Sequence, residues 1–191
     1  MPGLPILERF VCDLRAIWAA QGDNQSRMQA TRPLLERLLA DPELKAHSAQ
    51  WPSTEGRKNL LLYVDPDYHF AINAVVRAPG RVGSVHGHAD AWVLYGILDG
   101  SERLERYDRL DDGSEPGHAE LRLSSVTIGT QGKVDLVPPR AIHAEQGGPT
   151  RSGPLLCAVS GWAKARCSST AMTPSNRQWS SDMDPRRCRL S

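Results

Sequence analysis

The sequence predicts a mostly-β domain preceded by two amphipathic helices. Apolar residues recur at helical spacing through the first 50 residues. After Trp51-Pro52, short runs rich in β-branched and aromatic residues alternate with turn signals such as DPD, APG and DDGSEPG. Six or seven short strands separated by turns of this kind are typical of an antiparallel sandwich or barrel.

Each predicted helix carries an apolar stripe that would face a core. The first stripe runs from Ile6 to Trp18, and the helix is expected to end near Gly22. The second helix is expected to begin around Thr31-Arg32-Pro33, because proline suits the first turn of a helix. Its inward residues would be Leu34, Leu35, Leu38 and Leu39, with Leu44 near its end. We expect both stripes to pack on the β-domain rather than to bind a partner.

The later part of the chain divides into strands and a tail. The expected strands are LLLYV (60–64), FAINAVV (70–76), WVLYGIL (92–98), RLERYDRL (103–110), ELRLSSV (120–126), VDLV (134–137) and PLLCAVSGW (154–162). From about Cys167 the chain is rich in Ser, Thr, Arg and Pro, which predicts a mobile tail. The expected division is a helical segment over 1–50, a barrel over 51–166 and a tail over 167–191.

Composition excludes several classes of protein. Hydrophobic residues make up 40% of the chain, enough to build a core, and 23 Lys+Arg against 22 Asp+Glu leave no basic excess for nucleic acid or a membrane surface. Charged residues interrupt the apolar ones at the N-terminus, unlike a signal peptide, and no stretch is apolar enough to span a bilayer. The four cysteines form no CxxC pair. We therefore expect a cytoplasmic protein with a small-molecule or protein partner.

Two histidines stand two residues apart in GSVHGHADAW. On a strand, His86 and His88 would project to the same side, and two neutral imidazoles on one face can share a transition metal. An HxH pair is by itself a weak signal, because surface pairs of this kind are common.

The residues around this pair make the signal more specific. Two blocks have regular spacing, formed by Gly80, His86, His88 and Gly100 and by Gly132, Pro138 and His143. Over residues 80–147 these blocks resemble the two motifs of the cupin superfamily, G-x5-HxH-x3-4-E-x6-G and G-x5-PxG-x2-H-x3-N. The resemblance implies a cupin barrel, a jelly-roll-like double-stranded β-helix, with one metal bound by His86, His88 and His143.

Three positions depart from the motifs. Val93 replaces the glutamate of the first, and Arg140 and Gly147 replace the glycine and asparagine of the second. Three histidines without a carboxylate resemble the ligands of thiol dioxygenases and some diketone-cleaving enzymes more than those of four-ligand manganese cupins. Such a set leaves the metal its full charge and about three open positions. A cupin barrel with structural histidines and no metal remains the alternative.

The segment from Arg57 to Gly100 resembles the core of bacterial thiol dioxygenases (cysteine and 3-mercaptopropionate dioxygenase). The shared features are a basic residue before an apolar strand, an Asp65-Pro66 turn, and Pro79-Gly80 ahead of the histidines. The resemblance implies that Arg57 holds a substrate carboxylate, for which its planar guanidinium is suited. A solvated arginine at a strand start fits the position equally well.

One feature of thiol dioxygenases is missing. Their Ser-x-His-x-Tyr set falls here at Leu156, Ala158 and Ser160, so the resemblance covers the metal ligands but does not by itself imply a thiol substrate.

Three further residues are candidates for the pocket. Strict alternation places Trp92 on the face of the histidines and Tyr95 on the other, whereas the cupin spacing places Val93 near the metal. Trp92 and Tyr95 are candidate substrate-binding residues, with core packing the alternative for Trp92. Glu145, two residues after His143, is a candidate base or partner of the ligands, and a solvated loop glutamate is the alternative.

The favoured function is a non-haem Fe(II)-dependent dioxygenase, thiol-dioxygenase-like, with one iron per chain, acting with O2 on a small metal-chelating substrate. Two alternatives stay open: a metal-dependent lyase, isomerase or hydrolase that does not use oxygen, and a non-catalytic ligand-binding cupin. Nickel, manganese or zinc in place of iron and a homo-oligomer also stay open.

Overall fold

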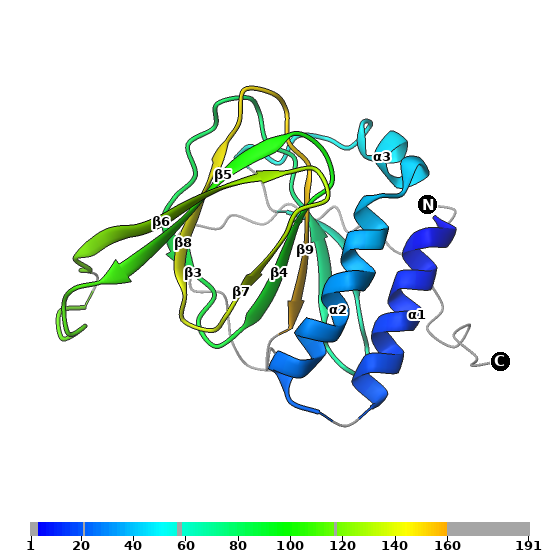
Figure 1. Ribbon diagram of the computed structural model, residues 1–191, viewed down its shortest axis with the longest axis horizontal. Helices are drawn as coiled ribbons and strands as arrows, with labels where there is room; N and C mark the ends of the chain where they lie inside the picture. The colour runs from blue at the N-terminus through cyan, green and yellow to red at the C-terminus, as the bar shows by residue number, and fades with distance from the viewer. Residues whose placement is uncertain (1–3, 21, 57–58, 117, 160–191) are drawn as a thin grey trace.

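The computed structural model describes residues 4–20, 22–56, 59–116 and 118–159, with the backbone alone described from 155 onward (Figure 1). The helices are α1 (Pro5–Ala19), α2 (Asn24–Leu39) and α3 (Pro42–Ser48). The strands are β1 (Leu60–Val64), β2 (Ala71–Ala74), β3 (His86–Gly87), β4 (Trp92–Ile97), β5 (Ser101–Arg109), β6 (Leu121–Thr130), β7 (Val134–Val137), β8 (Ile142–Gly147) and β9 (Pro154–Val159).

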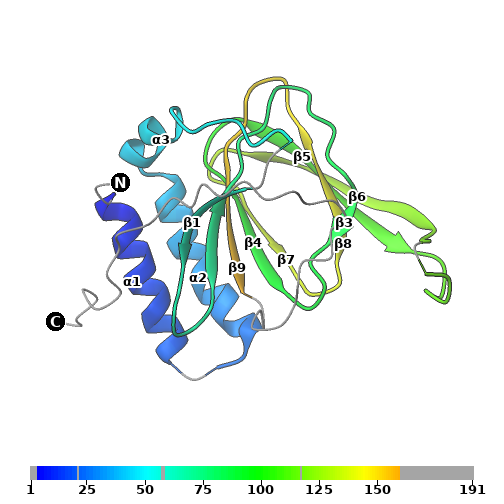
Figure 2. The same cartoon turned by 180° about the vertical axis from the view of Figure 1, so that it is seen from behind.

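The strands form two antiparallel sheets. One has the order β1-β2-β9-β4-β7, and the other β3-β8-β5-β6. Seen from opposite sides in Figures 1 and 2, α1 and α2 lie against the five-stranded sheet, and the four-stranded sheet lies on its other side. This confirms the predicted fold class of a mostly-β domain with antiparallel sheets and N-terminal helices.

The helical segment differs from the prediction at two places. The second helix begins at Asn24 rather than near Thr31, because the Asp23 carboxylate caps it by accepting a hydrogen bond from the Ser26 amide (2.8 Å). Pro33 therefore lies inside α2, on its exposed side. Leu44 belongs to the additional helix α3, whose first turn is capped by Asp41.

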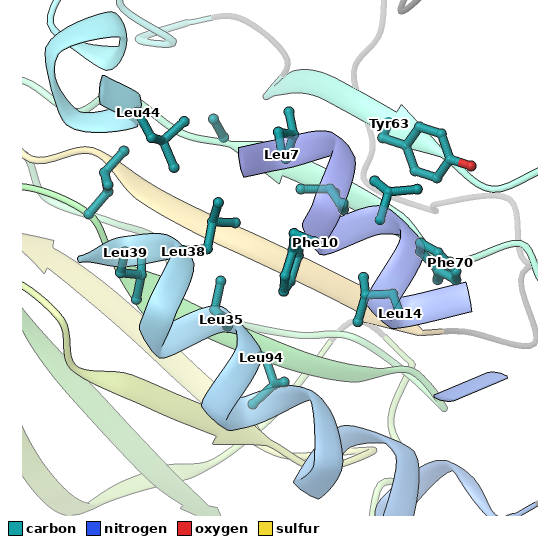
Figure 3. Packing of buried hydrophobic residues seen from close by; sticks show 14 of the residues in the cluster. Leu7, Phe10, Leu14, Leu35, Leu38, Leu39, Leu44, Tyr63, Phe70 and Leu94 are labelled. Carbon is teal, nitrogen blue, oxygen red and sulfur yellow. The ribbon is translucent and has the colours of Figure 1, made fainter. Parts of the chain in front are cut away.

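The main hydrophobic core lies between the helices and the five-stranded sheet (Figure 3). Its largest buried side chains include Phe10, Leu14, Leu35, Leu38, Leu39, Phe70 and Leu94. Gly96 of β4 allows α2 to lie close to the sheet, since a Cβ there would come 2.7 Å from Leu39 Cδ1. Both predicted apolar stripes thus contribute to this core.

The expected C-terminal tail over 167–191 lies outside the described residues. No helix in the described ranges is long and apolar enough to cross a bilayer. Cys12 of α1 is disulfide-bonded. Because disulfides are rare in a reducing cytoplasm, the cysteines give no support to the cytoplasmic expectation.

Replacing Leu39 by Ala should destabilise the protein by about 2–5 kcal/mol, because Leu39 is fully buried between α2 and β4. The matched control is Leu123→Ala on β6, where the side chain is 44% exposed and the expected change is within about 0.5 kcal/mol. Denaturant unfolding of the two variants measures the difference. Equal losses would contradict the assignment of the core to the helix–sheet layer.

Candidate metal centre

The pairing of β3 with β8 brings two of the three predicted histidines together. In this antiparallel pair His86 lies directly opposite His143, so both side chains project from the same face. His88 follows two residues after His86, just beyond the end of β3. The ring centroids of the three residues are 4.4–5.1 Å apart. The structure therefore gathers the three histidines into one cluster.

Hydrogen bonds orient two of these rings. The Nδ1 atom of His86 lies 3.0 Å from the carbonyl oxygen of Ser84, and that of His143 lies 3.1 Å from a carboxylate oxygen of Glu145. Both partners are acceptors, which assigns the proton to Nδ1 and leaves an Nε2 lone pair on each ring. The His143 Nε2 atom lies 3.0 Å from the Nε2 atom of His88.

The donor set fits a transition-metal ion. One nitrogen from each histidine lies within 4.8 Å of the others. Two nitrogens 3.0 Å apart have the spacing of ligands about 2.1 Å from one ion at roughly a right angle. Burial and the neighbouring His86 and Arg106 lower the pKa of His88 to about 4 and that of His143 to about 3. Both rings are therefore neutral near pH 7, the form that binds metal.

The turn that follows β3 and the turn that precedes β8 are joined by a backbone hydrogen bond. The Arg140 amide donates a hydrogen bond to the Ala89 carbonyl oxygen (2.7 Å). Both residues have positive φ, 62° for Arg140 and 51° for Ala89. Arg140 occupies the motif's glycine position, and its left-handed backbone explains why glycine suits that place. The conformation is retained here although the glycine is not.

Glu145 is buried, at 4% exposure, rather than solvated in a loop. It lies two residues after His143 on β8, so the two side chains share a face. One of its oxygens faces His143 Nδ1, and the other lies 3.4 Å from an Arg77 nitrogen. Burial raises the pKa of the Glu145 carboxyl. Both oxygens nevertheless face donors, as expected of an ionised carboxylate.

Arg77 connects Glu145 to a second buried carboxylate. Its Nε atom lies 3.2 Å from Glu102 Oε1, and its terminal nitrogen lies 3.3 Å from the Tyr95 hydroxyl. Glu102 also accepts hydrogen bonds from Tyr95 and from the Ser152 hydroxyl. This polar group closes one end of the barrel interior, since each of its side chains is 10% exposed or less.

The opposite end of the interior is partly open. Arg106 of β5 lies opposite His143 of β8, so both face the interior. Arg106 donates to Asp135 (2.6 Å) and to the Leu136 carbonyl oxygen. The Arg106 and Asp135 side chains are 25% and 31% exposed. The cluster thus lies between a closed polar end and an open end with an ion pair.

The other predicted pocket residues are placed differently. Trp92 packs against the helix-facing core, as does Leu94, whereas Val93 and Tyr95 lie on the interior face. The turn at Ala89, between β3 and β4, breaks the strict alternation, so the cupin spacing gave the correct face. Tyr95 is 2% exposed and lies at the closed end. Arg57 lies outside the described residues, and its role stays a prediction.

Sequence reasoning missed three charged residues of this interior. Arg77 follows the apolar run AINAVV, and Glu102 and Arg106 alternate with Leu104 along β5. A charged residue at the end of an apolar strand, and charged residues on either side of an apolar one on the same face of another strand, are detectable signals. From the sequence alone these charged residues look like ordinary solvated residues of a strand. The strand pairing is needed to show that they face the interior.

Comparisons with known proteins give likenesses among solved structures alone. No family model and no curated protein matches the sequence. The Schizosaccharomyces pombe Cnp3 cupin domain aligns at 13% identity and TM-score 0.43, covering 54% of this chain and 64% of that one. A Klebsiella pneumoniae protein with a double-stranded beta-helix domain aligns at 16% and 0.42, covering 60% and 80%. Oxalate oxidase in complex with the substrate analogue glycolate aligns at 20% and 0.42, covering 54% and 49%.

This chain therefore spans less than two thirds of the Cnp3 and oxalate oxidase chains.

The metal-free protein should keep His88 and His143 neutral well below the ordinary histidine pKa of 6.5, because their pKa values are about 4 and about 3. Between pH 6.5 and 4 the unfolded chain then binds protons at these residues that the folded chain does not. Their contribution to stability is therefore lost as the pH falls through this window. An NMR titration of the imidazole resonances measures it, and protonation of either ring above pH 6 would contradict the account.

Proposed function

We propose that the protein is a metal-dependent enzyme of the cupin type, an Fe(II) dioxygenase acting on a small anionic substrate that chelates the metal. The single observation that supports this is the cluster of His86, His88 and His143, which offers neutral nitrogens from one face and, among the described residues, includes no carboxylate. A cation bound by three neutral ligands keeps its full charge and has positions left for other ligands. An anionic chelator offsets that charge.

In this proposal iron supplies the binding and electron chemistry for oxygen, and the protein supplies positioning and exclusion of water. The Nε2 atoms of His86 and His143 are held toward the ion by the hydrogen bonds at their Nδ1 atoms. Val93 and Val137 pair across β4 and β7 on the interior face and are 2% and 1% exposed. They make an apolar wall where the cupin motif has a carboxylate.

Arg106 is the group that orients the substrate in this proposal. It lies beside His143 at the open end, and Asp135 holds its guanidinium in place. Arginine pairs with carboxylates through two parallel hydrogen bonds, so it would favour an anionic substrate entering from this end. Arg57 remains a second candidate for the same task.

His143→Ala should reduce bound metal to a small fraction of the wild-type content, because it removes one ligand of three. The fold should remain, since the core between the helices and the sheet does not involve the ion. The control is His118→Ala, which changes an exposed histidine outside the cluster. Elemental analysis of the purified variants measures the content, and full occupancy in His143→Ala would contradict the three-ligand site.

The oxygen step is tested by uptake measurements on a panel of small thiols, diketones and hydroxy acids. Oxygen consumption is expected only when both iron and one of these substrates are present. Anaerobic turnover of a panel compound at an undiminished rate, with zinc or nickel accepted in place of iron, would overturn the dioxygenase. It would support instead a lyase, isomerase or hydrolase at the same site.

A further inference from the structure

The buried charges next to the cluster do not balance. Within the described interior, Arg77 faces two carboxylates, Glu102 at 3.2 Å and Glu145 at 3.4 Å. Glu102 has two further donors, the hydroxyls of Tyr95 and Ser152. Glu145 has Arg77 on one oxygen and the His143 ring on the other. The group thus carries one more carboxylate than cation, and the excess is at the imidazole.

The extra carboxylate compensates for a glutamate that the cupin motif has and this chain lacks. The cupin motif has a glutamate where this chain has Val93, which is buried on the interior face. Glu145 lies one hydrogen bond further out, behind His143. From there a carboxylate offsets part of a bound cation's charge through the ring without occupying a coordination position. It also fixes which ring nitrogen carries the proton.

We propose that Glu145 is the positioning residue of this centre: it holds the His143 proton on Nδ1, presents Nε2 to the metal, and increases the affinity for a divalent cation. Arg77, Glu102 and Tyr95 act through Glu145 by holding its carboxylate in place. The inference rests on the proposed metal site. It explains how a three-histidine centre is stabilised while its remaining coordination positions stay free for other ligands.

The first experiment measures Co(II) affinity of the full chain by competition with a chromogenic chelator. Glu145→Gln keeps an acceptor oxygen for the ring but loses the charge, and Glu145→Leu loses both. Affinity should fall roughly 10- to 100-fold in the variants, with the larger loss in Glu145→Leu. The matched control is Glu105→Gln, which removes another buried carboxylate one residue along β5 from Arg106. Glu105 accepts hydrogen bonds from Tyr107 and Gln146 instead of a histidine of the cluster.

The second experiment needs no metal. Nitrogen-15 chemical shifts should show the His143 proton on Nδ1 in the wild-type and Glu105→Gln proteins, and an altered tautomer population in Glu145→Leu. If Glu145→Leu does not fold, the affinity test uses Glu145→Gln, and the tautomer test uses the wild-type protein.

Two results would overturn the inference: wild-type Co(II) affinity in Glu145→Gln, or a His143 proton on Nε2 in the metal-free wild-type protein. If the wild-type protein bound no Co(II), the proposed function would fail instead. The tautomer would still decide whether Glu145 positions His143. If either overturning result were found in a protein that still binds Co(II), the inference about Glu145 would fail and the proposed function would stand.

Discussion

The pairing of β3 with β8 is the constraint on which the candidate centre depends. Its register sets His86 opposite His143 and thereby puts the Nε2 atoms of both rings on one side. A slip of one residue would turn His143 and Glu145 away from the interior, because side chains alternate along a strand. Gly83, which precedes β3, also contacts β8: its amide donates a hydrogen bond to the Gln146 side chain, and a Cβ at Gly83 would clash with the Glu145 backbone.

The two ends of the barrel interior differ in how their charged groups are exposed. At the closed end, buried charges are held by one another and by hydroxyl groups, and they contact the cluster through Glu145. At the open end, Arg106 and Asp135 are partly exposed and lie beside His143. The proposed anionic substrate would meet Arg106 on the exposed side of the cluster, while Glu145 contacts His143 from the buried side.

Much of this arrangement was accessible from the sequence, since the cupin spacing identified three histidines that the structure brings within one cluster. The apolar stripes predicted helices packed on a sheet, although the start of α2 was wrong because the cap at Asp23 acts before Pro33. The strands β3 and β8 were missing from the list of expected strands, because β3 has two residues and β8 has only two apolar ones, Ile142 and Ala144. Long-range pairing decides these strands, and one sequence does not encode it locally.

In the proposed centre the three histidines bind one metal ion, and no carboxylate coordinates it. A crystal structure of the Co(II)-loaded protein, with anomalous scattering at the cobalt edge, tests it most directly. The account predicts one peak roughly 2.0–2.2 Å from the Nε2 atoms of His86, His88 and His143, with Glu145 hydrogen-bonded to His143 and not to the ion. A peak elsewhere, or cobalt bound directly by Glu145, would contradict it.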